Sequence, residues 1–161
     1  MNLISRVIDQ EAHFKISDLS GGSMLPGCLR VAKESIFTDY MKKTISIRDT
    51  FVKKPTKENF YHGLLLGILG FKENWSVMSN RESGDGFSDI LIRIEDEDVG
   101  IVIEVKYASG GNMEKECENA LQQITDVRYT ESLEQEGIHK IIKYGIACYK
   151  KKCKVMMKIE G

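Results

Sequence analysis

Residues 100–108 read GIVIEVKYA, and this stretch decides the fold of the 161-residue chain. Glu104 and Lys106 interrupt what is otherwise one of the most apolar runs in the sequence. Burying two opposite charges in a strand is costly unless each of them finds a partner. The stretch therefore predicts a central strand whose two charges have a function, and the preceding segment indicates which.

A second candidate strand, FSDILIRI at residues 87–94, comes before this stretch and is separated from it by the turn EDED. The alternation of side chains in both segments predicts an antiparallel hairpin in which Ile90 lies opposite Ile103. A slip of one residue would move the aliphatic side chains to the wrong face, so the register is well defined. The same register places Asp89 opposite Glu104.

Two opposed carboxylates, with Cβ atoms roughly 5 Å apart, destabilise a sheet unless something compensates their charge. A Mg²⁺ ion does so, because it prefers carboxylate oxygens and keeps several of its waters. Lys106 emerges on the same face as Glu104, where it could activate a metal-bound water or stabilise charge on a phosphate. The alternative is a surface ion pair of Lys106 with Glu104 or Asp89, which is common and contributes little.

These residues resemble the D…(D/E)-x-K core of the PD-(D/E)XK nuclease superfamily. The similarity is to a nuclease-like domain that usually follows an AAA-ATPase-like domain, and it covers residues 58–155. It implies a restriction-endonuclease-like α/β fold. Five segments carry the resemblance in order: ENFYHGLLLGIL (58–69), NRESGDGFSDI (80–90), IVIEVKYA (101–108), ALQQITDVRYT (120–130) and IIKYGIACYKKKC (141–153).

The resemblance implies a role for each residue of the core. Asp89 and Glu104 are expected to bind Mg²⁺, or Mn²⁺ as its substitute, together with the carbonyl group of Val105. Lys106 is expected to be the catalytic lysine. His62, on the helix before the sheet, corresponds to a position near the metal in related nucleases.

The exonuclease-like branch of the superfamily also brings a glutamine and a tyrosine towards the metal. Gln123 and Tyr129 are the corresponding candidates here, and Gln122 competes for the first role. Their spacing differs from the Q-xxx-Y of that branch.

The substrate implied by the resemblance is DNA. The chain has 23 basic and 24 acidic residues, so any basic footprint for nucleic acid has to be local. Candidate phosphate contacts are Arg81, Lys150, Lys151 and Lys152. Lysines on neighbouring strands could also simply protect the edge of the sheet from pairing.

The periodicity of the chain predicts a mixed β-sheet of about five strands flanked by helices, with an N-terminal helical segment. Residues 1–56 are predicted to form a helical, turn-rich extension packed on the core, and residues 57–161 the nuclease-like domain. The predicted elements are a helix over 55–70, strands over 75–82, 87–94 and 99–107, a long helix ending near 137, and strands over 140–151 and 153–160.

Composition excludes several other classes of protein. The four cysteines lack the paired spacing of a zinc site, so reduced thiols are expected. No apolar stretch is long enough to cross a bilayer, and a signal peptide is not evident, which predicts a cytoplasmic protein without a membrane partner.

The leading hypothesis is therefore a Mg²⁺-dependent deoxyribonuclease. One alternative is a catalytically silent module that binds nucleic acid or oligomerises within an ATPase system. Another is a domain that binds only proteins. An ATPase partner and a homo-oligomer both remain open.

Overall fold

The structure is a computed structural model that describes Thr38 and residues 41–43, 45–51, 56–70, 75–83, 86–94 and 97–160. Most of the predicted N-terminal extension lies outside these residues, so its helical character and its packing stay predictions. The described elements are a 3-10 helix η1 (Ile47–Thr50), helices α3 (Lys57–Leu69), α4 (Met113–Asp126) and α5 (Glu131–Gln135), and strands β1 (Trp75–Ser83), β2 (Gly86–Ile94), β3 (Val99–Tyr107), β4 (Lys140–Tyr149) and β5 (Lys152–Glu160).

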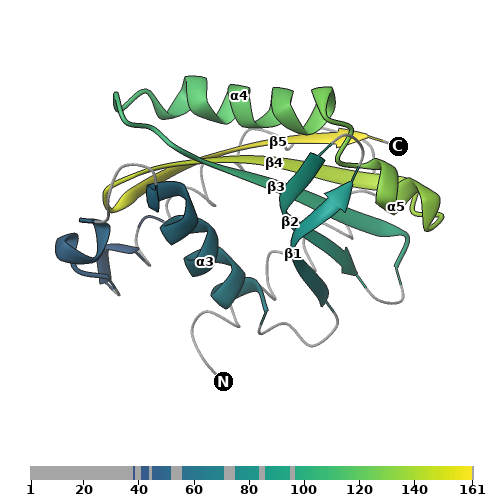
Figure 1. The fold of residues 1–161 in the computed structure, drawn as a ribbon, viewed down its shortest axis with the longest axis horizontal. Coiled ribbons are helices and arrows are strands. Elements are labelled where there is room, and N and C mark those ends of the chain that lie inside the picture. Colours follow the sequence, from purple (N-terminus) through teal and green to yellow (C-terminus); the bar gives the residue numbers. More distant parts are fainter. Residues whose placement is uncertain are drawn as a thin grey trace, which may run out of the picture.

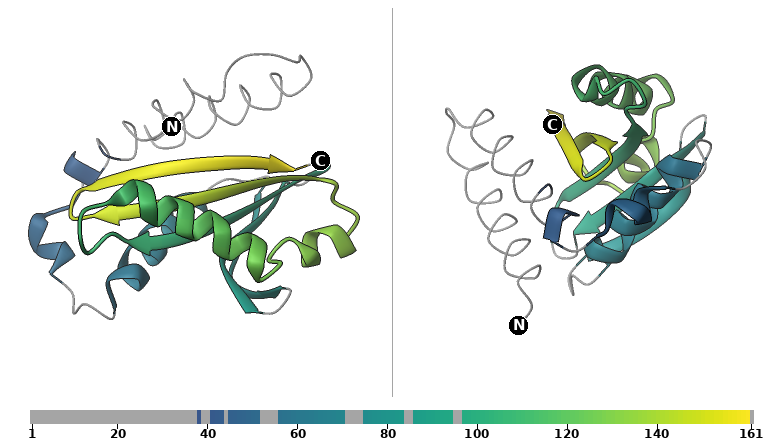
Figure 2. Two further views of the ribbon diagram at one scale, coloured as in Figure 1. Left: turned by 90° about the horizontal axis from the view of Figure 1, so that it is seen from above. Right: turned by 90° about the vertical axis from the view of Figure 1, so that its left-hand side faces the viewer.

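The five strands form one mixed sheet in the order β1-β2-β3-β4-β5. All neighbouring pairs are antiparallel except β3 and β4, which are parallel. A parallel pair needs a crossover connection, and α4 and α5 supply it here. The sheet separates α3 on one face from α4 on the other (Figures 1 and 2). The predicted α/β fold, a five-stranded mixed sheet flanked by helices, is confirmed.

The register of the β2–β3 hairpin is the predicted one. Ile90 pairs with Ile103, and the ladder continues in step to Arg93 and Gly100. The two sheet faces carry different cores. On the α3 face, the core contains Ile90, Ile92, Ile101, Ile103 and Val105 of the hairpin and Tyr61, Leu65 and Leu69 of α3. On the α4 face, it contains Leu91, Val102, Leu121, Ile124 and Leu133.

The apolar character of α3 is explained by its contact with the sheet. Tyr61 and Leu65 are almost completely buried in the core beneath β2 and β3.

Among the residues that the structure describes, no helix is both long and apolar enough to cross a membrane.

The prediction of one long helix that ends near Gly137 is wrong, because the structure has two helices in this segment. Helix α4 ends at Asp126, and Arg128 adopts a left-handed conformation with φ 54°. The N–H group of Tyr129 then donates to the carbonyl group of Ile124 over 3.1 Å. This turn directs Tyr129 into the protein before α5 begins.

Helix α4 lies close to the sheet at Gly145 of β4, which lies beside Glu104 in the parallel register. A Cβ atom at Gly145 would overlap the carbonyl oxygen of Cys117 and lie 3.0 Å from Cγ of Leu121. The absence of a side chain at Gly145 therefore sets the height of α4 above the strand that carries Glu104.

We expect Gly145→Ala to lower the free energy of unfolding by about 1–3 kcal/mol, because α4 must move away from the sheet. Gly67→Ala is the matched control, since a Cβ atom there meets nothing within 4 Å on α3. This control is expected to raise stability by about 0.5–1 kcal/mol. Urea denaturation measures both, and equal effects of the two substitutions would contradict the close approach of α4.

Candidate active site

The candidate site begins where the β2–β3 ladder ends. The last pair is Ile90 with Ile103, and Asp89 and Glu104 are the next residues beyond it on the two strands. The N–H group of Val105 donates to Oδ2 of Asp89 over 2.8 Å. The Asp89 carboxylate thus accepts a backbone hydrogen bond from β3 just beyond the last pair of the ladder, which holds it next to the strand of Glu104.

Glu104 is buried, with 3% of its surface exposed. Its Oε1 atom accepts hydrogen bonds from Nζ of Lys106 over 2.9 Å and from Nε2 of Gln123 over 2.6 Å. Its Oε2 atom is buried and has no hydrogen-bond partner among the described residues. A buried carboxylate oxygen without a partner is costly, so this atom marks a position where a cation would be stabilising.

The charge of Lys106 does not fully compensate the burial and mutual repulsion of the Asp89 and Glu104 carboxylates. Burial, and after it the charge of Asp89, raises the pKa of the Glu104 carboxyl to about 7, against the opposing effect of Lys106. Burial also raises the pKa of Asp89. Burial lowers the pKa of Lys106, but the nearby carboxylates, that of Glu104 first, more than offset it and leave the pKa above its usual value. All three shifts favour the uptake of positive charge, which a divalent cation would supply.

The residues present fit Mg²⁺ or Mn²⁺ better than Zn²⁺. Within the part of the chain that the structure describes, no group of three or more His, Cys, Asp or Glu side chains is placed to hold a metal. A structural zinc site needs four such ligands, whereas Mg²⁺ is held by one or two carboxylates and several waters. The carboxylates of Asp89 and Glu104 and the carbonyl group of Val105 are the groups that would hold it.

The structure distinguishes the two candidate glutamines on α4. Gln123 contacts Glu104, and its Nε2 atom also lies 3.1 Å from the hydroxyl of Tyr129. Gln122 is exposed and donates instead to Asp126. The left-handed residue Arg128 makes the six-residue separation of Gln123 and Tyr129 possible, because it turns the tyrosine back towards the helix.

Helix α3 contributes His62 and Glu58, which lie one turn apart. Nε2 of His62 is 2.9 Å from the carbonyl oxygen of Asp89 and 3.2 Å from Oγ of Ser79. The histidine therefore contacts the backbone of Asp89. Glu58 accepts a hydrogen bond from the N–H group of Tyr107 over 3.1 Å, and its charge raises the pKa of Asp89.

Glu58 is a site residue that the sequence pattern did not single out. The available signal was its spacing of four from His62, which puts the two side chains on the same face of the helix.

The predicted phosphate contacts occupy two places. Arg81 lies on β1 opposite Ser88 in the register. Lys150 and Lys151 form the β4–β5 turn and Lys152 begins β5, beyond the end of β3 that carries Lys106. The turn is fixed, since the hydroxyl of Tyr61 donates to the carbonyl group of Lys150 over 2.7 Å.

We expect Gln123→Ala to reduce the rate of the DNA cleavage predicted from the sequence by about ten-fold. The substitution removes a hydrogen bond to a charged, buried carboxylate. Gln122→Ala deletes the same side chain one residue earlier and should leave activity unchanged. The ratio of the two initial rates at equal protein concentration measures the effect. Similar losses of the initial rate in both variants would show that the contact of Gln123 with Glu104 does not contribute to the reaction.

Comparison with known protein families identifies the superfamily to which the matched segment is similar. The model of the family described as the PD-(D/E)XK nuclease superfamily matches residues 56–158, more than half of the chain. The matched segment contains both carboxylates of the hairpin, the lysine, and the contacting residues of α3 and α4. No curated protein sequence matches the chain. An association with an AAA-ATPase-like domain stays a prediction.

Proposed function

The chain belongs to the PD-(D/E)XK nuclease superfamily, and from this premise we propose that it is a metal-dependent nuclease that hydrolyses phosphodiester bonds of DNA. The observation that carries the proposal is the state of the Glu104 carboxylate. One of its oxygens is shared by Lys106 and Gln123, and the other is buried without a hydrogen-bond partner in the described chain. A protein that only binds its partner gains nothing from such a costly arrangement.

The carboxylates of Asp89 and Glu104, with the carbonyl group of Val105, would hold Mg²⁺ or Mn²⁺. When bound, such an ion neutralises charge on the scissile phosphate and lowers the pKa of a coordinated water. Asp89 is held for this role by the hydrogen bond from the Val105 N–H group.

Lys106 places a positive charge 2.9 Å from Oε1 of Glu104, at the partly open side of the site. Its side chain is 20% exposed, so substrate can approach Nζ without unfolding the strand. A fixed ammonium group at this place would stabilise the negative charge that develops on a phosphate during hydrolysis, or orient the attacking water.

Gln123 of α4 contacts the same carboxylate, and Tyr129, in the turn after α4, contacts Gln123. The amide nitrogen of Gln123 donates to Oε1 of Glu104 and lies against the hydroxyl of Tyr129, which limits the rotation of the amide group. The two residues thereby orient Glu104. Positioning of this kind tunes a metal ligand without touching the substrate.

The test is incubation of the purified protein with linear and with circular DNA, in Mg²⁺, in Mn²⁺ and in EDTA. Cleavage that requires either metal and stops in EDTA is the expected result, and cutting of the circular substrate identifies internal cleavage. Binding of DNA without cleavage in either metal would contradict the proposal and favour the silent accessory module.

A further inference from the structure

Three tyrosines from three elements form a row beside the candidate site. The ring centroids of Tyr61 on α3 and Tyr107 on β3 are 6.0 Å apart, and those of Tyr107 and Tyr149 on β4 are 6.1 Å apart. Tyr61 is buried, whereas Tyr107 and Tyr149 are partly exposed. Tyr107 packs on the α3 face of the sheet, opposite to the side chain of Lys106. Its N–H group donates to Glu58, whose charge raises the pKa of Asp89 and of Lys106, so the row adjoins the site through Glu58.

A lysine lies against each of the two partly exposed rings. Nζ of Lys57 is 4.5 Å from the ring centroid of Tyr107 and 3.1 Å from its hydroxyl. Nζ of Lys150 is 5.2 Å from the ring centroid of Tyr149. Proteins that bind single-stranded nucleic acid combine these two elements, since rings stack on bases and cations track the phosphates.

The row is held firmly. The hydroxyl of Tyr61 donates to the carbonyl group of Lys150 over 2.7 Å, which joins α3 to the β4–β5 turn. The N–H group of Tyr107 donates to Glu58 over 3.1 Å. The start of α3, the end of β3 and the β4–β5 turn therefore meet at one end of the sheet, on the left in Figure 1.

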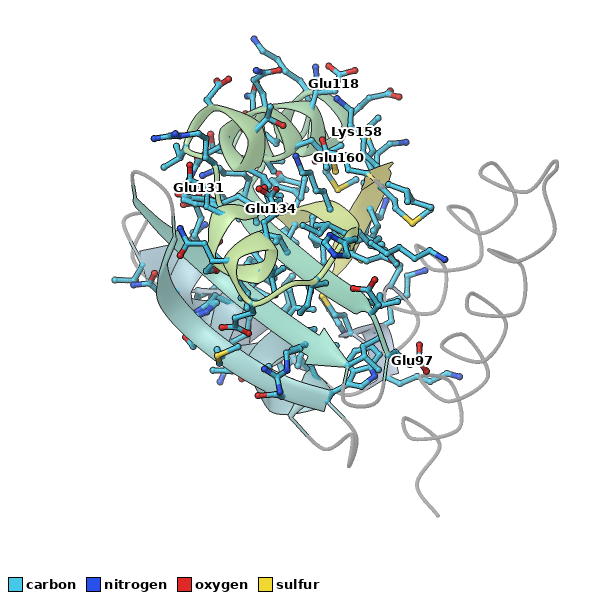
Figure 3. The ribbon with its side chains drawn as sticks, turned by 90° about the vertical axis from the view of Figure 1, so that its right-hand side faces the viewer. Glu97, Glu118, Glu131, Glu134, Lys158 and Glu160 are labelled. Atoms are coloured by element: carbon cyan, nitrogen blue, oxygen red, sulfur yellow. The ribbon has the colours of Figure 1, made fainter. Side chains whose placement is uncertain are left out.

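The charge of the surface favours an approach of DNA from this end. Around the β4–β5 turn, the exposed charges include those of Lys42, Lys43, Lys150 and Lys152. The outer side of α4 is acidic by contrast, with exposed residues Glu114, Glu118 and Asp126 against a single lysine, Lys115. Figure 3 labels Glu118 on this acidic side. A phosphate backbone would be repelled there and attracted at the tyrosine row.

We infer that this edge, formed by Lys57, Tyr107, Tyr149 and Lys150, binds single-stranded DNA and leads it to the carboxylates. A base stacks on a partly exposed tyrosine while the lysine moves from the ring to a phosphate. The inference rests on the proposed nuclease function and names its substrate class. A base inside a duplex is already stacked on its neighbours, so single strands and frayed ends fit this edge and intact duplexes do not.

Fluorescence anisotropy with a labelled single-stranded oligonucleotide and with the matched duplex tests the inference. The titrations are run in EDTA and again in Ca²⁺, so that binding is measured apart from Mg²⁺-dependent cleavage. The wild-type protein should bind the single strand more tightly than the duplex. Tyr149→Ala should raise the Kd for the single strand by about five-fold or more, whereas Tyr149→Phe keeps the ring and should change it little.

Charge is tested with a matched pair of lysine variants. Lys150→Ala removes a cation of the tyrosine edge, and Lys158→Ala removes an exposed lysine from β5, which Figure 3 labels on the side of Glu118. Only Lys150→Ala should weaken binding of the single strand clearly. Thermal melting and circular dichroism check that each variant is folded. If Tyr149→Ala fails to fold, the comparison of Lys150→Ala with Lys158→Ala tests the edge without it.

Several results would overturn the inference: equal or tighter binding of the duplex, no binding of the single strand in either buffer, unchanged affinity in Tyr149→Ala, or equal losses in the two lysine variants. The proposed function fails separately. If the protein passes the binding tests but cuts no DNA in Mg²⁺ or Mn²⁺, it is not a nuclease. If it cuts duplex DNA but fails the binding tests, it is a nuclease with a different substrate.

Discussion

The Lys106→Ala variant is expected to lose DNA cleavage by about a hundred-fold or more while it remains folded. The substitution removes the positive charge that lies 2.9 Å from Oε1 of Glu104 and faces the open side of the site. Stability should fall as well, because the buried carboxylate loses its ion-pair partner. Unfolding should nevertheless stay cooperative, since the packing of both cores is unchanged.

Initial cleavage rates over a range of Mg²⁺ concentrations measure this effect, with circular dichroism as the check of folding. Lys115→Ala is the matched control, because it removes one exposed lysine from the outer side of α4. The control should cleave like the wild-type protein. Full cleavage by folded Lys106→Ala would exclude the lysine from the reaction.

Glu104→Gln is expected to abolish the stabilisation of the protein by divalent cations. At a Mg²⁺ concentration of ten times its Kd, a ligand that binds only the folded state contributes about 1.4 kcal/mol. For a chain of this size, such a gain raises the melting temperature by about 3–6 °C. The variant keeps the shape of the side chain but removes half of the paired carboxylate charge, so its melting temperature should not respond to Mg²⁺ or Mn²⁺.

Thermal melts in EDTA and in metal measure the shift without any need for activity. Glu118→Gln, on the exposed side of α4, is the matched control and should keep the full shift of the wild-type protein. An equal metal-induced shift in Glu104→Gln would mean that the cation binds elsewhere.

Much of the site could be predicted because it follows from the register of one hairpin. The aliphatic side chains of Ile90 and Ile103 can face the core in only one register, and the structure has that register. The position of Asp89 relative to Glu104 then follows from alternation alone. Local periodicity was sufficient here because the core on the α3 face takes every second residue of both strands, so a slip of one residue would remove Ile90 and Ile103 from it.

Residues on the helices could not be assigned in the same way. Gln122 and Gln123 are neighbours, and which of them reaches Glu104 depends on the rotation of α4 on the sheet. That rotation is fixed by the contact of α4 with Gly145, which is remote in the sequence. The end of α4 at Asp126 could not be predicted for a different reason. A positive φ is uncommon for a residue such as Arg128, so the local sequence did not indicate it.

Anomalous X-ray scattering from a crystal grown in Mn²⁺ tests most directly whether the opposed carboxylates form a cation site. We expect a manganese peak between the carboxylates of Asp89 and Glu104, in contact with Oε2 of Glu104 and the carbonyl oxygen of Val105. A structure that lacks manganese at this place, with Glu104 bound only by Lys106 and Gln123, would show that the charges form an ion pair and not a metal centre.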